Sequence, residues 1–449
     1  MMPTWRAAAL LALGAVVNLV GAVTVPAWPD AWLGAAIALG AVLVLSILDG
    51  LLAGAAGDVL LSRSGDTQTR LGESATVLLS VTNAGVRTIR GEVRDAWVPS
   101  AGAVPYAHDI LVDPDTTVEL PTELSPTRRG ERRAVRVTIR SYGPLGLGFR
   151  QTTRRAADAL TPPWTVTVLP RFDSRKHLPE KLSRLRIIDG LVVTRGRGQG
   201  TEFDALREYV IGDDVRSIDW RSSARRHDVL VRTWRPERDR RVLCVLDTGR
   251  TSAARISGER GADEPRLDAA MDAALLLATL ATYADDRVNL LAIDTRVRVA
   301  HTSGSKRTAQ SRLITALAGL EPSLVETDWE RVAAEVLRRE RRRALVVLFT
   351  ALEPGALAEG LVPILPLLVA RHRVVLAAVH DTALDDLAVR RGAVSDVYTA
   401  AAAERALADR RRIRAALTRF GVEVVDEPVQ MFAPAVADAY LRLKAAGKL

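Results

Sequence analysis

Cysteine and histidine are scarce in this chain of 449 residues, and each scarcity excludes a class of site. The single cysteine, Cys244, cannot form an internal disulfide, and its place in the apolar run Val242 to Leu246 favours a buried structural thiol. The six histidines show no His-x-x-x-His spacing, and the sequence contains no Walker A segment. Any ATP chemistry must therefore belong to a partner, and no catalytic set emerges from these residue types.

Aromatic residues are also few, at 4% of the chain, although the chain is basic. Lys and Arg number 62 against 53 Asp and Glu, which gives a formal charge of +9. Nucleic-acid binding by stacking needs aromatic side chains among the cations, and the runs Arg338 to Arg343 and Arg410 to Arg414 contain none. We interpret both runs as solvated helix ends or faces and expect no nucleic acid. An anionic membrane surface suits the excess charge better.

Two long apolar runs, Ala7 to Val25 and Ala31 to Leu48, lie near the N-terminus. Each approaches the ~20 residues that a helix needs to cross a membrane, so residues 1–52 are predicted to form a transmembrane hairpin, with a buried hairpin of a soluble protein as the alternative. The connecting turn lacks Lys and Arg, whereas Arg6 precedes the first run and Arg63 and Arg70 follow the second. This bias predicts a multi-pass protein of a bacterial plasma membrane, with the N-terminus and the C-terminal domain cytoplasmic.

Two local features near this hairpin could mark a ligand site. Asp49 ends the second apolar run, and its place at the rim favours a headgroup-level carboxylate over a functional intramembrane group. The glycine-rich segment Tyr142 to Gly148 resembles a phosphate cradle, but it lacks the Lys-Ser/Thr pair and a following helix. We therefore interpret it as an ordinary loop.

Residues 59–170 change to short alternating runs separated by turn residues. Ala134 to Arg140 alternates apolar and polar side chains, with Val135, Val137 and Ile139 assigned to one face. Alternation with a period of two over short segments is typical of antiparallel strands that have one wet face. The sequence predicts a small β-sandwich-like domain here.

Residues 171–240 contain the most charge-dense stretch, from Arg195 to Trp234. Glu202 and Phe203 are predicted to open a short helix that ends at Tyr209. Carboxylates alternate with several arginines, which is compatible with a metal-dependent site, as in a nuclease, or with a structural ion-pair network. Because arginine competes with a cation for each carboxylate, the network is favoured. The carboxylates concerned are Glu202, Asp213, Asp214 and Asp219.

The same stretch resembles the signature of the domain of unknown function 58 family, through Gly198-x-Gly200-x-Glu202-Phe203, Gly212-Asp213-Asp214 and Ile218-Asp219-Trp220 at fixed spacings. The resemblance implies a membrane protein with a von Willebrand A-like module, often found with MoxR-type AAA+ ATPases and thought to act in chaperone or envelope assembly. The candidate signature or binding residues are Gly200, Glu202, Phe203, Arg207, Tyr209, Gly212, Asp213, Asp214, Arg216, Asp219, Trp220, Ser223 and Arg225.

Residues 241–449 alternate apolar strands with amphipathic helices. Continuously apolar strands such as Val242 to Leu246 and Ala344 to Phe349, each followed by a helix, predict a mostly parallel sheet covered on both faces. Ligands of such sheets bind beyond the carboxyl ends of the strands. The fold prediction is thus two transmembrane helices, a β-sandwich-like domain and a C-terminal von Willebrand A-like α/β domain.

Von Willebrand A-like domains carry a divalent-metal site at this edge, and the resemblance implies Asp247, Thr251 and Thr327 as its ligands here. Gly249 stands where the pattern has a serine, and Ala351 stands where it has an aspartate. A small cation that needs a nearly complete oxygen shell would lose much of its driving force. We expect a degenerate site, with no cofactor or only weak Mg²⁺.

Three functions remain open from the sequence. The first is a non-enzymatic membrane scaffold or adaptor that binds a cytoplasmic protein, for which a MoxR-type AAA+ ATPase is the candidate partner. The second is a metal-dependent hydrolase centred on Glu202, Asp213, Asp214 and Asp219. The third is an anionic-lipid or nucleic-acid binding protein, which would show steep salt dependence. The adaptor is the leading hypothesis.

Overall fold

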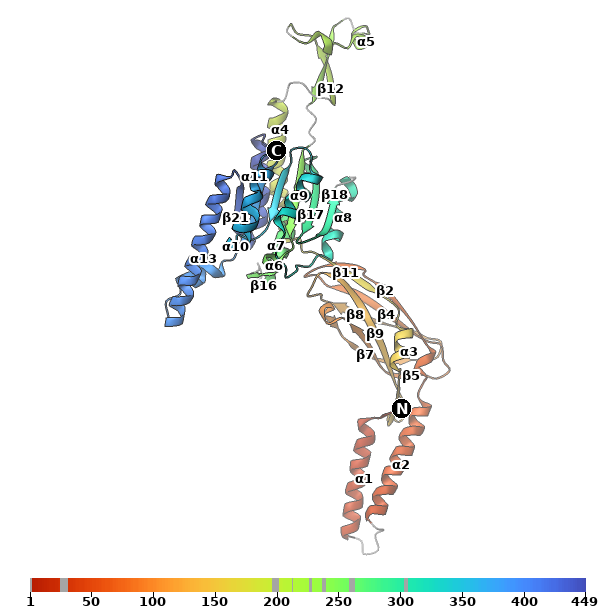
Figure 1. Cartoon of the computed structure of the whole chain (residues 1–449). Coiled ribbons are helices and arrows are strands. Elements are labelled where there is room, and N and C mark those ends of the chain that lie inside the picture. Colours follow the sequence, from red (N-terminus) through yellow and green to blue (C-terminus); the bar gives the residue numbers. More distant parts are fainter. Residues whose placement is uncertain are drawn as a thin grey trace. The chain divides into compact units, whose positions relative to one another are not determined.

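The computed structural model of the protein describes residues 2–24, 31–195, 202–211, 213–225, 228–235, 240–257, 263–302 and 306–449. The chain divides into two compact units, Met1–Leu169 and Pro170–Leu449 (Figure 1). The first unit contains the apolar hairpin together with the β-rich region. The second contains the signature stretch and the α/β region.

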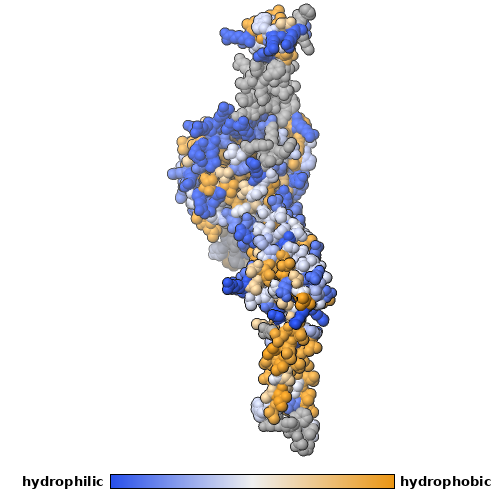
Figure 2. All heavy atoms as spheres, turned by 90° about the vertical axis from the view of Figure 1, so that its right-hand side faces the viewer, coloured by the Kyte–Doolittle hydropathy of each residue, from blue (hydrophilic) through white to orange (hydrophobic). Residues whose placement is uncertain are grey.

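The N-terminal hairpin consists of α1 (Trp5–Thr24) and α2 (Ala31–Leu52). Both helices are long and apolar enough to cross a membrane, and they lie side by side (Figure 1). A Cβ added at Gly14 would meet Ala38 at ordinary van der Waals distance, so small residues allow this close packing. Most other side chains of the hairpin are exposed and apolar, which the orange surface of this region in Figure 2 shows. Such a surface suits lipid better than water.

Asp49, near the end of α2, is a buried hydrogen-bond acceptor, whereas the sequence predicted a carboxylate at the level of the lipid headgroups. Its side chain is almost fully enclosed, at 1% exposure. It accepts hydrogen bonds from the backbone N–H groups of Leu145 (2.7 Å), Leu147 (2.7 Å) and Gly148 (2.9 Å). The expectation was wrong because the glycine loop, about a hundred residues later in sequence, folds over the carboxylate and replaces water as its hydrogen-bond donor.

The glycines of this loop are needed for its close approach to α2. A Cβ at Gly143 would overlap the backbone and carboxylate of Asp49, and a Cβ at Gly148 would overlap the carbonyl oxygen of Ser46. The N-terminal end of the hairpin is tied to the same loop, because the Thr4 hydroxyl donates to the Gly146 carbonyl oxygen at 2.6 Å. Both ends of the hairpin are therefore attached to the β-rich region.

Two sheets form the rest of the first unit. The four-stranded sheet runs β2 (Val59–Gly65), β4 (Ala75–Asn83), β8 (Thr117–Leu124) and β6 (Ala103–Val104). The seven-stranded sheet contains β1 (Met2–Pro3), β10 (Gly148–Gln151), β9 (Gly130–Tyr142), β11 (Thr165–Leu169), β3 (Gln68–Arg70), β5 (Ile89–Trp97) and β7 (Ala107–Val112). All pairings are antiparallel except that of β11 with β3, which is parallel.

Both sheets contribute to one apolar core. Leu79 and Val81 of β4 meet Val93 of β5 and Ile139 of β9 within a single buried cluster. This clustering places the two sheets face to face. Val137 and Ile139 lie inside as the alternation predicts, but Val135 is exposed because the β5–β9 register shifts between Ala96 and Trp97.

The second unit is built on a six-stranded sheet in the order β18-β17-β14-β19-β20-β21. The pairings β14–β17, β14–β19, β19–β20 and β20–β21 are parallel, and β17–β18 is antiparallel. The strands are β14 (Arg241–Asp247), β17 (Arg287–Ile293), β18 (Val297–Thr302), β19 (Leu345–Phe349), β20 (Arg373–His380) and β21 (Glu423–Pro428).

Helices cover both faces of this sheet, as Figure 1 shows. One face is covered by α9 (Trp329–Arg339), α11 (Val362–Val369) and α13 (Val394–Arg419), whose buried side chains join those of the strands in one cluster. On the other face, α7 (Arg266–Tyr283) packs against α14 (Val429–Ala445) and α4 (Leu178–Arg195). Further helices of this unit are α8 (Lys306–Ala318) and α12 (Ala383–Val389).

The run Arg410 to Arg414 differs from the expectation of a solvated helix face. Arg410 is buried, and its Nε lies 3.0 Å from both carboxylate oxygens of Asp426 on β21. Its Nη2 also donates to the carbonyl oxygen of Val379 on β20 at 3.0 Å. Because α13 packs against the edge of the sheet, one arginine of the run turns inward and joins the helix to two strands.

Candidate functional site

The signature stretch forms a small module around two antiparallel strands, β12 (Glu202–Glu208) and β13 (Leu230–Arg235). Between them lie the 3₁₀ turn η4 (Val215–Ser217) and the short helix α5 (Trp220–Ser223). The prediction of a helix from Glu202 to Tyr209 was wrong. Pairing with β13, which is more than twenty residues away, outweighs the helix-favouring composition of this segment.

The carboxylates of the module stabilise its turns by accepting hydrogen bonds from nearby backbone and side-chain groups. Asp213 pairs with the Arg207 side chain and accepts the Val210 backbone N–H at 3.0 Å. Asp214 accepts the Arg216 backbone N–H at 2.9 Å and so caps η4. The hydrogen bond from the Arg207 side chain, followed by that from Val210, lowers the pKa of Asp213. Asp213 therefore stays ionised and holds the turn before η4.

Asp219 is the second hub of the module. It caps α5 by accepting the backbone N–H groups of Arg221 and Ser222, each at 3.1 Å, and it pairs with Arg232 at 2.9 Å. The hydrogen bond from Ser222 and then that from Arg232 lower the pKa of Asp219. Ser223 extends this hydrogen-bond network to β13. Its hydroxyl donates to the Asp219 carbonyl oxygen and accepts the Leu230 N–H, both at 2.8 Å.

These carboxylates do not converge on one point. Among the described residues, no group of three or more His, Cys, Asp or Glu side chains is placed to hold a metal ion. Gly200 and Gly212 lie outside the described residues, as do the side chains of Glu202 and Phe203. Tyr209 is half-buried, whereas Trp220, Arg216 and Arg225 are exposed on the surface of the module.

Replacing Asp219 with alanine is expected to loosen the module, because it removes the cap of α5 and the partner of Arg232 together. Limited trypsin digestion of the full chain should then cut after Arg221 and Arg225 sooner than in the wild type. Asp219→Asn keeps one acceptor oxygen for the cap and should fall between the two. Unchanged digestion with a loss of function alone would instead indicate a reactive carboxylate.

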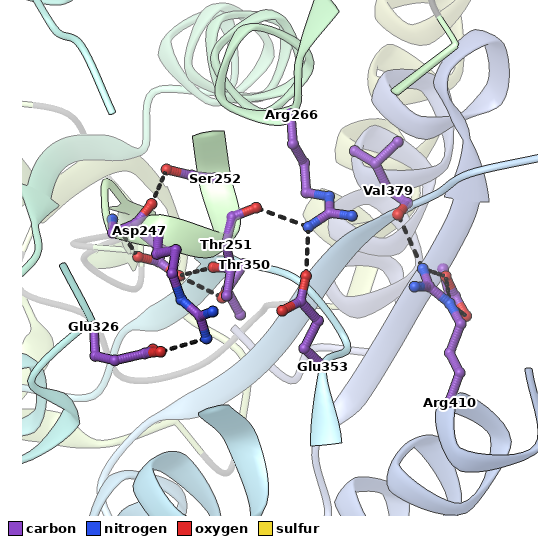
Figure 3. A network of polar contacts seen from close by, with 12 residues as sticks. Asp247, Thr251, Ser252, Arg266, Glu326, Thr350, Glu353, Val379 and Arg410 are labelled. Atoms are coloured by element: carbon purple, nitrogen blue, oxygen red, sulfur yellow. Dashed lines mark hydrogen bonds and ion pairs between the residues drawn. The ribbon is translucent and has the colours of Figure 1, made fainter. Parts of the chain in front are cut away.

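A second polar cluster lies at the carboxyl end of β14, around Asp247 (Figure 3). Asp247 Oδ1 accepts the Gly249 N–H at 2.8 Å and the Thr327 hydroxyl. Its Oδ2 accepts the hydroxyls of Thr251 at 3.0 Å and Thr350 at 2.6 Å. The structure thus brings together all three residues that the resemblance implied as ligands, and adds Thr350 from the end of β19.

Ion pairs flank this cluster. Arg250 pairs with Glu326, and Arg266 Nη1 lies 3.1 Å from Glu353 while donating to the Thr251 carbonyl oxygen at 2.8 Å (Figure 3). The backbone also joins the loops, because the Arg250 N–H donates to the Val325 carbonyl oxygen at 2.8 Å. The loops after β14, before α9 and after β19 therefore form one connected polar edge.

Asp294, at the end of β17, supports this edge and was missed by the sequence analysis. It is fully buried and accepts the hydroxyls of Thr248 (3.0 Å) and Ser323 (2.7 Å) and the Nε of Arg298 (2.6 Å). Burial acts to raise its pKa, but the hydrogen bonds from Ser323 and Arg298 outweigh burial and lower the pKa to about 2. The available signal was its position directly after a buried strand, which Asp247 shares.

Asp272 on α7 is a second residue that sequence reasoning missed. Its Oδ1 accepts the backbone N–H of Ser174 at 3.3 Å and the Ser174 hydroxyl at 3.0 Å. Burial raises the pKa of Asp272 to about 7, against the opposing effect of the Ser174 hydrogen bonds. Its charge state therefore changes near neutral pH.

This shift predicts that the second unit becomes less stable as the pH rises from about 4 to about 7. The folded form holds the Asp272 proton up to about pH 7, whereas the unfolded chain releases it near 3.8, so unfolding becomes easier between these values. The loss should be on the order of 2–3 kcal/mol, because partial hydration of a half-buried carboxyl reduces the full effect. Urea unfolding of Asp272→Asn should show little of this decline, and Asp268→Asn on the same helix should retain it.

Residues 205–423 match the family model described as "Protein of unknown function DUF58". No curated protein matches the sequence. Among solved structures, the VWA domain of SpRpn10 is similar at 11% identity and a TM-score of 0.27, covering 44% of this chain and 94% of that domain.

The CARDB domain of a Pyrococcus furiosus protein, crystallised in complex with di-metal ions, is similar at 15% identity and a TM-score of 0.19. That match covers 25% of this chain and 87% of that domain. A solution structure of the same CARDB domain matches at 15% identity and a TM-score of 0.18, covering 25% and 94%. The family match extends from the signature module through the α/β sheet to the start of β21, so this part of the chain is similar to the DUF58 family, whose function is unknown.

Proposed function

We propose that this chain is a membrane-anchored, non-enzymatic adaptor that binds a protein partner through its second unit. The observation that carries the proposal is the attachment of the apolar hairpin to a folded β-rich region through Asp49. Three backbone hydrogen bonds to a buried carboxylate make this connection stiff, unlike a flexible tether. A stiff anchor with an exposed apolar surface is what a membrane scaffold requires.

The proposed membrane is a bacterial plasma membrane, which the chain crosses twice. The absence of Lys and Arg from the turn and the presence of arginines in both flanks support a cytoplasmic N-terminus and a cytoplasmic second unit. A green fluorescent protein fused after Leu449 should then fluoresce, and alkaline phosphatase fused there should be inactive. The reverse result would overturn the orientation and any contact with a cytoplasmic partner.

The distribution of carboxylates supports an adaptor over a hydrolase. Asp213, Asp214 and Asp219 are each occupied by caps and ion pairs of their own segment. A von Willebrand A-like α/β unit then supplies the binding edge, and the family resemblance makes a MoxR-type AAA+ ATPase the candidate partner. No part of this scheme requires turnover by the chain itself.

Purification of the full chain from native membranes after mild crosslinking tests the partner. We expect a stoichiometric AAA+ ATPase in the complex, with no hydrolase activity in the purified chain under any divalent metal. Metal-dependent hydrolysis that is abolished by Asp219→Ala would favour the hydrolase instead.

A further inference from the structure

We infer that the edge around Asp247 binds a carboxylate of a protein partner through the Arg250 guanidinium, in place of a metal ion. This inference rests on the proposed adaptor function and names its recognition chemistry. The observation behind it is that Arg250 already holds a carboxylate at this edge, that of Glu326 (Figure 3). Three features of the edge lead to this conclusion.

First, the Asp247 carboxylate has no acceptor capacity left for a cation. A carboxylate offers about four lone-pair positions, and Gly249, Thr251, Thr327 and Thr350 donate to all of them. Each of the three hydroxyls directs its proton toward Asp247. A metal would have to displace these donors, and among the described residues no group of three or more His, Cys, Asp or Glu side chains is placed to hold one.

Second, the positions of the missing ligands are closed. A Cβ at Gly249 would overlap the Thr327 hydroxyl oxygen, so the side chain of Thr327 occupies the space that a serine at position 249 would need. Ala351 is buried and apolar where the family pattern has a charged ligand. The residues present therefore do not fit a hexacoordinate Mg²⁺ ion.

Third, the edge carries fixed positive charge. Arg266 is mostly buried and is held by Thr251 and Glu353, so it is part of the framework. Arg250 differs, because its side chain is 59% exposed and its partner Glu326 is 60% exposed. An exposed ion pair contributes little stability and opens at little cost.

Arg250 is also well placed for exchange of partners. Its backbone N–H donates to the Val325 carbonyl oxygen. This hydrogen bond fixes the backbone from which the Arg250 side chain extends. A guanidinium binds a carboxylate through two parallel N–H donors. In the structure the Glu326 carboxylate is paired with this guanidinium. An aspartate or glutamate of a protein partner would take the place of Glu326.

Photo-crosslinking in native membranes tests the inference. A photoreactive amino acid replaces Leu324, which is 81% exposed two residues before Glu326, in the full chain. A second full chain carries the same group at Ile211 of the signature module, which is 97% exposed. Adducts are quantified with and without a chelator, and with Arg250→Gln, Arg250→Lys and Glu326→Gln in the Leu324 background.

We expect an adduct at position 324 that is unchanged by the chelator. Arg250→Gln should reduce it about tenfold, and Arg250→Lys should restore part of it, since a point charge lacks the fork. Glu326→Gln should increase it about two- to fivefold, because the internal competitor is removed. This combination of effects, and not capture of a protein as such, supports the inference.

Other results separate the inference from the proposed function. Loss of the adduct with the chelator and its return with Mg²⁺ would overturn the inference in favour of metal-mediated binding. An adduct that is indifferent to Arg250→Gln, or one found only at position 211, would also overturn it while leaving the adaptor function intact. No adduct at either position would remove both.

Discussion

Replacing Asp49 with alanine is expected to detach the helical hairpin from the β-rich region and to destabilise the first unit by about 3–5 kcal/mol, because each buried N–H group that loses its acceptor costs ~1–3 kcal/mol. The substitution leaves the N–H groups of Leu145, Leu147 and Gly148 without their acceptor in a buried place. Hydrogen exchange of the full chain in detergent measures this directly. The amides of residues 145–148 should exchange at least a hundredfold faster, since ~2.8 kcal/mol of lost protection gives that factor.

Two variants control this result. Asp49→Asn keeps one acceptor oxygen and should show an intermediate effect, and Asp109→Ala removes an exposed carboxylate of β7 in the same unit and should change nothing. Unaltered exchange in Asp49→Ala would show that the loop is held by its glycine packing alone. The hairpin would then be a loosely attached anchor, and the stiffness argument for a scaffold would fail.

The elements predicted well from sequence are those whose apolar pattern is decided locally. The apolar runs Val242 to Leu246 and Ala344 to Phe349 form β14 and β19, with ends that differ from the prediction by at most one residue. Both strands are buried along nearly their whole length, as continuously apolar runs in a covered sheet predict. Cys244 is likewise buried in β14, and burial raises the pKa of its thiol to about 12, as a structural cysteine requires.

The predictions that failed depend on partners distant in sequence. Residues 202–208 have a helix-favouring composition, and only pairing with β13 makes them a strand. Asp49 and Arg410 were placed at surfaces because their own segments gave no sign of the glycine loop or of Asp426. Thr350 shows the same limit at the candidate site, since its role follows from the order of β14 and β19 in the sheet.

Replacing Asp247 with alanine should destabilise the second unit by about 3–5 kcal/mol, because a buried acceptor shared by several donors is lost. The Gly249 N–H and the hydroxyls of Thr251, Thr327 and Thr350 all lose their acceptor, and Asp247 itself is buried. Thermal unfolding of the full chain should show a Tm lower by roughly 10 °C. Thr350→Val removes a single donor and should cost only about 1 kcal/mol, which makes it the matched control.

The same unfolding experiment distinguishes a closed polar cluster from a metal site. If the four donors saturate Asp247, then about 10 mM Mg²⁺ should leave the Tm of the wild type unchanged, whereas a site with a Kd of about 0.1 mM would gain ~2.7 kcal/mol at that concentration. The destabilisation by Asp247→Ala should be equally large with Mg²⁺ and with a chelator. A Mg²⁺-dependent rise in Tm that Asp247→Ala abolishes would contradict the closed cluster. The hydroxyls would then have to turn their lone pairs toward a cation, and capture of a partner's carboxylate by metal would replace capture by Arg250.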